Sequence, residues 1–222
     1  MTKRLSKKNN PAPSREPQAE QRAKSVFREY AEAIILAVLL ALFLRTFVIQ
    51  AFKIPSGSML PTLQVGDHIL VVKFIYGIRL PILNKVIVPL KAPQRGDVIV
   101  FVYPVDPSKD FIKRVVAIPG DTVEIRHKKL YINGQPVKDE HANFDDPAMY
   151  PMTIKPRDDF GPIKVPKHSL FVMGDNRDHS YDSRFWGFVD MDAVLGKAFL
   201  IYWSWDSDRW RVRWDRFANV VH

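Results

Sequence analysis

The sequence contains no cysteine, and this absence excludes three kinds of chemistry. A chain of 222 residues without cysteine has no disulfide framework, no thiolate metal site and no cysteine nucleophile. The absence does not indicate a compartment, because a chain of this length buries a large core without disulfides. The six histidines are scattered, and none lies in a run typical of a catalytic signature. Histidine is therefore a poor candidate for a general base.

Glycine is scarce relative to proline, with 10 glycines against 17 prolines, and short runs of valine, isoleucine, phenylalanine and tyrosine separate the turn residues. This pattern predicts a mainly β body. The hydrophobic content of 46% allows one sizeable core, or one core with a smaller lobe, and excludes a disordered or fibrous chain. The formal net charge of +9 permits an anionic partner, but charge alone does not choose between phospholipid and nucleic acid.

Only one long apolar run is present, from Ala33 to Ile49. As a helix it would span roughly 25 Å, which crosses a hydrocarbon layer of ~30 Å if Glu32 and Arg45 lie at opposite headgroup levels. A core helix would be apolar on one face only, and a cleaved signal peptide would have a shorter basic region. The run therefore predicts a transmembrane signal anchor over residues 30–50.

Basic residues precede this anchor, in a tail over residues 1–29, whereas few lie close to its far end. By the positive-inside rule, the tail is cytoplasmic and everything from Lys53 onward is extracytoplasmic. The tail has no apolar pattern, so we expect it to be disordered, with a helix starting near Glu20.

Ser58 follows the anchor closely, in a loop stiffened by Pro55 and Pro61, and Gly57 beside it allows a turn and a close approach to substrate. A serine hydroxyl is a weak nucleophile and needs a base to accept its proton. From this stretch alone, a nucleophile and an ordinary turn are equally good interpretations.

Lys113 is the better candidate for that base, because it lies in an almost wholly apolar predicted strand. Burial disfavours the ammonium form and makes the neutral amine available. Alternation along a strand lets only one of Lys113 and Arg114 point inward, so Arg114 would point the other way and need a carboxylate. The alternative is that both residues face solvent.

A stretch from Phe171 to Arg184 places three acids, two arginines and two serines behind a predicted strand. A calcium loop starting at Asp175 is excluded, because its sixth and twelfth positions would be Ser180 and Trp186 instead of glycine and glutamate. We interpret it as a hydrogen-bonded wall in which aspartate and arginine pair and a serine hydroxyl points inward.

Two further regions have their own patterns. The Asn-Gly pair within residues 129–137 predicts a hairpin, and residues 139–166 are expected to form a long irregular loop. Near the C-terminus, residues 199–205 and 210–214 predict a hairpin with an aromatic and a basic face. We expect residues 199–203 to pack in the core, and Trp210 and Trp214 to lie at the membrane interface.

Four stretches, in order, resemble the serial boxes of the type I (leader) signal peptidases. They are residues 54–63, 95–101, 111–121 and 174–184, and they follow the expected anchor. The resemblance covers most of residues 30–200 and implies a mainly β fold with one N-terminal transmembrane helix. It also implies an antiparallel β catalytic domain and a small inserted β lobe. We assign residues 51–121 and 167–222 to the catalytic domain and 122–166 to a non-catalytic lobe.

The resemblance also implies roles for individual residues. Ser58 would be the nucleophile, Lys113 its general base, and Ser56 would join the Ser58 N–H in the oxyanion hole. Ser180 would hydrogen-bond and orient Lys113. The wall would be held together by Asp175, Arg114, Asp182 and Arg184. The pockets for small substrate side chains would be lined by Phe52, Ile54, Met59, Leu63, Phe111, Ile112 and Val172. His179 stands where many relatives have asparagine, at a position that we expect to be tolerant.

The function implied is that of a membrane-bound serine endopeptidase, which removes N-terminal signal peptides from exported pre-proteins after small-x-small sites. It would lie in the bacterial inner (plasma) membrane with its catalytic domain in the periplasm. Its partners would be pre-proteins, the phospholipid bilayer and nearby translocation machinery, with no nucleic acid, metal or organic cofactor. Two alternatives remain: a specialised or self-cleaving Ser-Lys peptidase, and a non-enzymatic anchored β module that binds lipid or nucleic acid.

Overall fold

The computed structural model describes residues 16–79, 86–88 and 90–222, with side chains for 28–77, 88 and 90–222. These residues divide into two units, one ending at Phe43 and the other formed by Leu44–His222. The first unit is helical and the second is mainly β. The predicted mainly β fold with one N-terminal apolar helix is confirmed.

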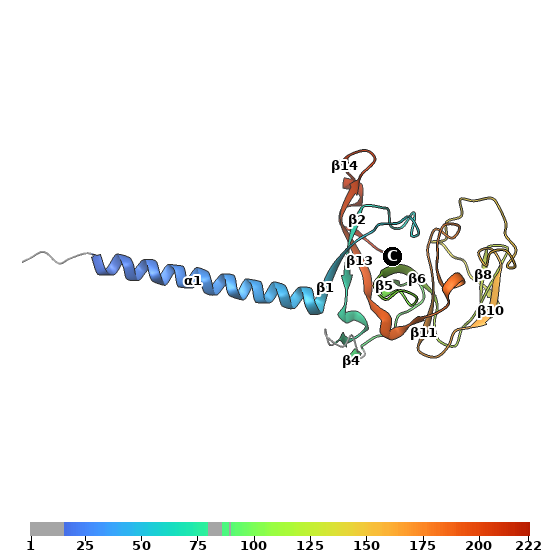
Figure 1. Cartoon of the computed structure of the whole chain (residues 1–222), viewed down its shortest axis with the longest axis horizontal. Coiled ribbons are helices and arrows are strands. Elements are labelled where there is room, and N and C mark those ends of the chain that lie inside the picture. The colour runs from blue at the N-terminus through green and yellow to red at the C-terminus, as the bar shows by residue number, and fades with distance from the viewer. Residues whose placement is uncertain (1–15, 80–85, 89) are drawn as a thin grey trace, which may run out of the picture. The chain divides into compact units, whose positions relative to one another are not determined.

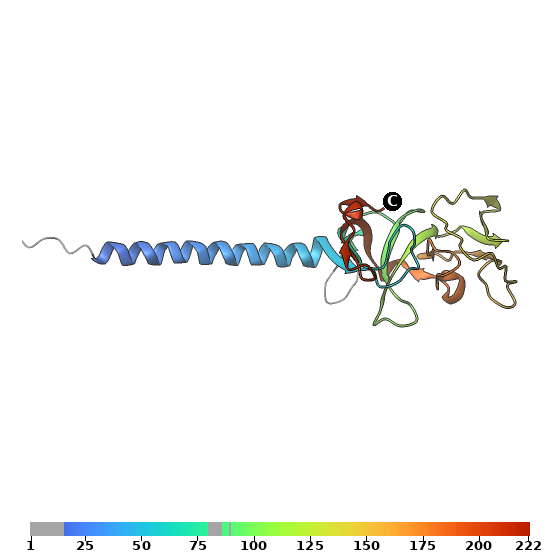
Figure 2. The same cartoon turned by 90° about the horizontal axis from the view of Figure 1, so that it is seen from above.

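The first unit is one continuous helix, α1 (Glu16–Phe43), and a π-helical segment, η1 (Leu44–Val48), follows it in the chain (Figure 2). The expectation of disorder up to Glu20 is wrong for the described part of the tail, because the helix already begins at Glu16. Residues 1–15 lie outside the described residues. The stretch Arg28–Val48 is long and apolar enough to cross a membrane, and none of it is buried within the protein. A core helix is thereby excluded.

The second unit is organised around one antiparallel sheet (Figure 1). Its strands, in the order in which they pair, are β1 (Ile49–Lys53), β2 (Asp67–Val72), β13 (Val194–Asp206), β5 (Val98–Val102), β6 (Asp110–Ala117), β11 (Ser169–Met173) and β12 (Val189–Asp190). Two short strands, β14 (Arg211–Val212) and β15 (Asn219–Val220), also pair with β13. The strand β1 starts at Ile49, so the last two residues of the predicted span already belong to this sheet.

Both faces of β5 are buried, which explains why its sequence is apolar without alternation. Val98 and Val100 pack with one core cluster, whereas Ile99 and Phe101 pack with another. The first cluster also contains Ile54, Met59 and Leu63 from the loop around Ser58. The loop around Ser58, residues 54–66, is therefore fixed to one hydrophobic face of the sheet; we call it the nucleophile loop, after the role expected for Ser58.

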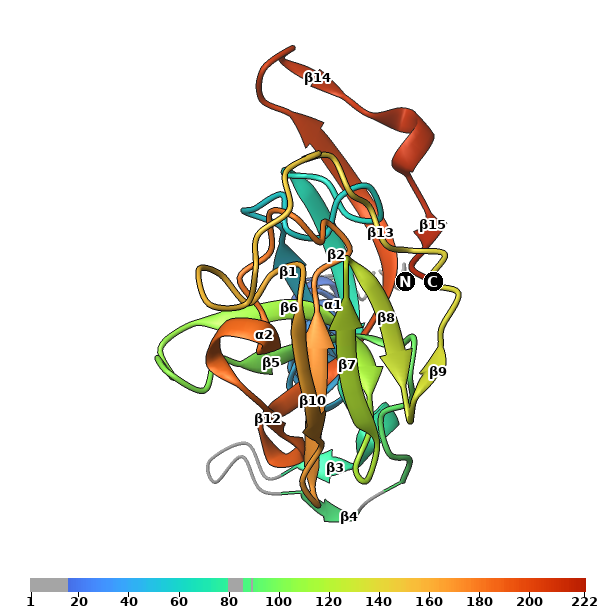
Figure 3. The same cartoon turned by 90° about the vertical axis from the view of Figure 1, so that its right-hand side faces the viewer.

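A second sheet has the strand order β10 (Phe160–Lys164), β7 (Thr122–Arg126), β8 (Lys129–Ile132) and β9 (Gln135–Pro136), and its strands lie side by side in Figure 3. The predicted hairpin at β8 and β9 is confirmed, with φ of 54° at Asn133 and 78° at Gly134. The expectation of an irregular loop over the whole of 139–166 is wrong for β10, which pairs with β7. This sheet shares a core with Phe171 and Met173 of β11.

The strand β13 ends in a hairpin with β14, as the sequence predicts (Figure 3). The predicted burial of Phe199 is wrong, because its side chain is 49% exposed. A β-bulge between Ala198 and Leu200 interrupts the pairing of β13 with β2, so strict alternation fails there. Trp210 and Trp214 are 82% and 70% exposed.

The remaining elements are short. They are β3 (Ile78–Arg79), β4 (Val86–Val88), the helix α2 (Ser183–Trp186), and the 3₁₀ turns η2 (Phe74–Tyr76), η3 (Met191–Ala193) and η4 (Trp214–Arg216). The side chain of Asp182 caps α2 by accepting from the Arg184 N–H, which fixes the end of the acidic stretch that follows β11.

Candidate active site

Ser58 and Lys113 are 55 residues apart in sequence and meet inside the second unit. Lys113 Nζ lies 2.7 Å from Ser58 Oγ, and the two residues are only 4% and 8% exposed. Lys113 comes from the middle of β6, where it pairs with Ile99 of β5, and Ser58 comes from the loop between β1 and β2. A strand and a rigid loop thus bring a hydroxyl and an amine into hydrogen-bonding contact.

The environment of Lys113 favours its neutral form. Burial lowers the pKa of Lys113 from 10.5 to about 8, although the nearby carboxylates of Asp182 and Asp175 act in the opposite direction. The Arg184 guanidinium adds to the lowering of this pKa. About one Lys113 side chain in ten is then neutral at pH 7, and about half at pH 8. A neutral amine in contact with a serine hydroxyl can accept its proton.

The loop that carries Ser58 is held from two sides. Ile54, Met59 and Leu63 are buried beneath it, and the Asn176 N–H donates to the Ser58 carbonyl over 3.2 Å. Ser56 Oγ lies 3.5 Å from Ser58 Oγ, so the second hydroxyl is within reach of a group bound at the nucleophile. The loop is therefore preorganised by packing and by a main-chain hydrogen bond.

Arg114 has the carboxylate that the sequence requires. Its Nε and Nη2 donate to the two oxygens of Asp175 over 2.8 and 2.7 Å, and both residues are almost fully buried. Thr62 donates its hydroxyl to Asp175 over 2.6 Å, which links the ion pair to the loop of Ser58. Arg114 is buried like its neighbour Lys113, so the alternative in which both face solvent is excluded.

Asp182 and Arg184 form a second buried ion pair, with 2.9 Å between Asp182 Oδ1 and Arg184 Nε. Burial raises the pKa of Asp182, but the positive charge and hydrogen bonds of Arg184 outweigh burial and lower this pKa overall. The Gly174 N–H also donates to Asp182, over 3.1 Å. This pair keeps a fixed negative charge near Lys113.

Ser180 does not make the predicted contact. Its hydroxyl is buried and lies close enough to Asp182 to help lower the pKa of that carboxyl. It has no hydrogen bond of normal geometry to any residue that the structure describes, including Lys113. The hydroxyl is instead pressed against Gly174, where an added Cβ would lie 2.3 Å from Ser180 Oγ.

A cavity of about 350 Å³ opens onto the Ser58–Lys113 pair. It is bounded by the nucleophile loop, the first half of β6 and the loop before α2. Its lining residues are Pro55, Ser56, Ser58, Asp110, Phe111, Ile112, Lys113, His179 and Tyr181. The cavity is large enough for a few peptide residues, and its wall carries the Ser58 hydroxyl beside the Lys113 amine.

The sequence comparisons agree with this geometry. The profile of the family described as "Signal peptidase, peptidase S26" matches residues 27–203, which include all of the cavity residues. The chain belongs to the S26 signal peptidase family. The comparison also covers the apolar stretch of α1, so the protein is a membrane-anchored member of that family.

Curated members of the family are similar over most of their length. The signal peptidase I of Pseudomonas aeruginosa is 40% identical over 211 residues, which cover 82% of this chain and 74% of the relative. The signal peptidase I of Leptolyngbya laminosa is 40% identical over 200 residues, which cover 86% of this chain and 87% of the relative. A crystal structure of a signal peptidase I from Enterococcus faecalis V583 is 34% identical, with a TM-score of 0.41, and covers 48% of this chain and 97% of that chain. The family assignment rests on the sequence matches.

The predicted pocket residues of this family member divide into three groups. Phe111 and Ile112 line the cavity. Ile54, Met59 and Leu63 lie in the core cluster beneath the nucleophile loop, and Phe52 packs against the same cluster. Val172 is fully buried in the cluster on the other face of β5. The structure thus brings two of the seven to the cavity wall and places the others behind it.

Several site residues were not singled out from the sequence. Gly174 is the clearest, because a Cβ there would also lie 2.3 Å from the Ser58 carbonyl. Thr62 and Asn176 hold the nucleophile loop, and Tyr181 lines the cavity together with His179, the position that we expected to be tolerant. Gly174, Thr62, Asn176 and Tyr181 all lie within the first or fourth resembling stretch, but a contact between residues 113 positions apart cannot be inferred from one sequence.

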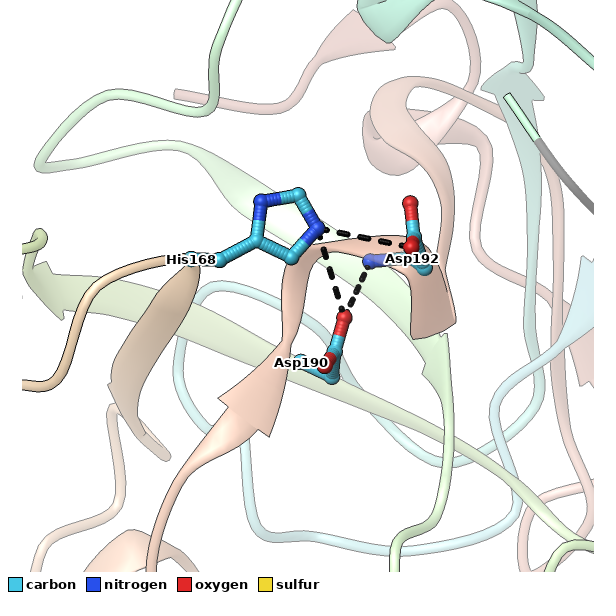
Figure 4. Close-up of side chains that lie close together, drawn as sticks. All are labelled: His168, Asp190 and Asp192. Carbon is cyan, nitrogen blue, oxygen red and sulfur yellow. Dashed lines mark hydrogen bonds and ion pairs between the residues drawn. The ribbon is translucent and has the colours of Figure 1, made fainter. Parts of the chain in front are cut away.

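One exposed histidine–carboxylate cluster lies outside the cavity (Figure 4). His168 Nε2 is 3.6 Å from Asp190 Oδ1 and 3.4 Å from Asp192 Oδ2. All three side chains are more than half exposed, and Asp190 already accepts the Asp192 N–H as the cap of η3. Surface ion pairs and a helix cap account for this arrangement, so we assign no metal to it.

Proposed function

We propose that this chain removes N-terminal signal peptides from exported pre-proteins by a Ser58–Lys113 mechanism. The observation that carries the proposal is the 2.7 Å contact between a buried serine hydroxyl and a buried lysine whose pKa is lowered to about 8. Histidine is not needed as the base, because the neutral amine supplies the same proton acceptor.

The edge of β6 offers a place for the substrate. The strand β11 pairs with residues 114–117 of β6, and among the described residues no strand pairs with Asp110–Ile112 on that side. An extended cleavage region can add there as a strand, which gives main-chain hydrogen bonds without sequence demands. Phe111 and Ile112 in the cavity wall would then favour small side chains on both sides of a variable residue.

The chemistry proceeds in two steps. The Ser58 hydroxyl attacks the scissile carbonyl as Lys113 accepts its proton, and the resulting ammonium protonates the amine that leaves with the mature protein. The Ser56 hydroxyl and the Ser58 N–H would stabilise the oxyanion. Lys113 then takes a proton from water, which hydrolyses the acyl-enzyme and regenerates both groups.

The anchor supports a location at the membrane. By the positive-inside rule, the basic tail over residues 1–29 would lie in the cytoplasm and the second unit outside, at the bacterial inner membrane, close to translocation machinery and to emerging precursors. Trp210 and Trp214 would touch the bilayer interface, where tryptophan is favoured. Catalysis beside the membrane fits a substrate that remains tethered by its own apolar segment.

Cleavage of a purified precursor by the intact protein in detergent tests the mechanism. Ser58→Ala and Lys113→Ala should each abolish the appearance of the mature mass, while circular dichroism stays unchanged. Substantial processing by either variant would exclude the Ser–Lys assignment. Adding the precursor in trans separates a signal peptidase from a self-cleaving one, since the latter would process only its own chain.

A further inference from the structure

The last residues of the sequence, 219–222, form a short strap along β13. β15 pairs with Leu200 and Ile201, and the Val221 N–H donates to the Phe199 carbonyl over 2.9 Å. The Val221 side chain is 6% exposed and belongs to the core cluster beneath the nucleophile loop. The strap is therefore fixed by a strand pairing and by a buried side chain.

The strap reaches the buried ion pair next to the active site. The His222 main-chain carbonyl accepts a hydrogen bond from Arg114 Nη2 over 2.8 Å. The same Nη2 donates to Asp175, and Nη1 donates to the Gly96 carbonyl over 2.7 Å. The guanidinium is thus surrounded by three acceptors, one of which comes from the strap.

This ion pair is connected to the nucleophile by short contacts. Asp175 accepts the Thr62 hydroxyl over 2.6 Å, and the next residue, Asn176, donates its N–H to the Ser58 carbonyl over 3.2 Å. A buried guanidinium that loses an acceptor must find another or leave an N–H unsatisfied, which is costly inside a protein. Loss of the His222 carbonyl would therefore disturb Asp175 and, through Thr62, the loop of Ser58.

We propose that His222 is a positioning residue, whose main-chain carbonyl fixes Arg114 and thereby the Ser58 loop. The strap acts through other residues and does not touch the reacting atoms. This inference rests on the proposed Ser58–Lys113 function and extends it to residues outside the four resembling stretches.

Two variants of the intact protein in detergent test the proposal. Deletion of His222 removes the carbonyl, and we expect kcat to fall by about 3- to 10-fold with KM within about twofold. The rate at which a peptide-like acylating inhibitor labels Ser58 should fall by the same factor. His222→Ala keeps the carbonyl and should restore kcat to within about twofold of the intact chain.

A coupling measurement separates positioning from a general loss of stability. Thr62→Val removes the hydrogen bond to Asp175 and should lower kcat, but its effect should be less than additive with the deletion, because both act through the same ion pair. Thermal unfolding of each variant shows whether the protein is folded at the assay temperature.

Three outcomes would overturn the inference: an unchanged kcat after deletion, an equal loss in His222→Ala, or fully additive effects of the deletion and Thr62→Val. Ser58→Ala runs in the same assay. If the intact chain cleaves and Ser58→Ala cleaves equally well, the proposed mechanism itself fails, which is distinct from failure of the strap.

Discussion

At the residue scale, adjacent positions of β6 have opposite electrostatic requirements. In the proposed mechanism Lys113 must be neutral to act as a base, whereas the Arg114 guanidinium is paired with the Asp175 carboxylate. The sequence indicates both requirements, since an apolar strand with two basic residues needs one partner for each. It could not indicate the Ser180 geometry, because the direction of a hydroxyl depends on packing against Gly174.

The pH dependence of cleavage follows from Lys113. In the proposed mechanism the neutral amine is the active form, and the pKa of Lys113 is lowered to about 8, so kcat/KM should rise through pH 8 and level off above it. Between pH 6 and 7 the rise should approach tenfold per pH unit. Initial rates with a fluorogenic peptide between pH 6 and 9.5 check this expectation, and a flat profile over that range would contradict it.

Gly174→Ala should damage the site without removing any chemical group. The new Cβ would lie 2.3 Å from both the Ser58 carbonyl and Ser180 Oγ, and main-chain atoms cannot move aside easily. We expect kcat/KM to fall by about 100-fold or more, which corresponds to about 3 kcal/mol in the barrier. Gly134→Ala has no neighbour within 4 Å of its Cβ, although its φ of 78° strains the alanine; it therefore serves as a control for backbone strain without a clash at the site. Near-normal activity of Gly174→Ala would show that the loop of Ser58 can move away from the added Cβ, and would contradict this expectation.

At the scale of elements, patterns within one strand or turn were predictable, and long-range pairings were not. The apolar run of β5 and the Asn-Gly turn of β8 and β9 follow from local sequence. The strand β10 was missed, since its partner β7 lies more than thirty residues earlier and its own sequence holds Pro162. The β-bulges in β13 change which residues point into the core, so the alternating pattern predicted burial for Phe199, which is exposed.

The hairpin of β13 and β14 should bind membranes. Replacing Trp210 and Trp214 by alanine removes two exposed indoles, and we expect partitioning of the second unit to anionic vesicles to fall about tenfold. Cleavage of a short soluble peptide without lipid should stay unchanged. Ile154→Ala, at a residue that is 73% exposed in the second unit, is the control. Equal partitioning of all variants would exclude the hairpin as a membrane contact.

At the scale of the whole molecule, the anchor and the second unit are consecutive in the chain, but they fold by different rules. The apolar composition of residues 33–49 was enough to predict the helix, because an apolar run of about this length is typical of a membrane-spanning helix. The curled sheet could only be expected through the family resemblance, as its order β1-β2-β13-β5-β6-β11 joins strands far apart in sequence. The start of β1 at Ile49 was also hidden inside the predicted span.

The start of β1 at Ile49 predicts where the chain can be truncated to remove the anchor. A protein lacking residues 1–48 keeps the whole of β1, whereas one lacking residues 1–50 loses the pairs Ile49–Val72 and Gln50–Val71. We expect both proteins to be soluble, and the melting temperature of the protein lacking residues 1–50 should be lower by a few degrees. The protein lacking residues 1–48 should cleave peptides weakly and gain activity with detergent or phospholipid. Differential scanning calorimetry and peptide cleavage measure the two expectations, and identical melting temperatures would contradict the role of β1.

The pairing of β1 with β2 also connects the anchor to the loop of Ser58. Between α1 and the nucleophile loop, the chain is held to β2 by five residue pairs, from Ile49–Val72 to Lys53–His68, and the Lys73 N–H also donates to the Val48 carbonyl over 3.0 Å. The pairing continues past Lys53, since the Ile54 N–H donates to the Asp67 carbonyl, and Ser58 follows only four residues later. A tension that peels β1 from β2 would therefore reach the nucleophile loop before it reaches Lys113. The pairing of β1 with β2 therefore holds the segment that leads to Ser58 on the sheet.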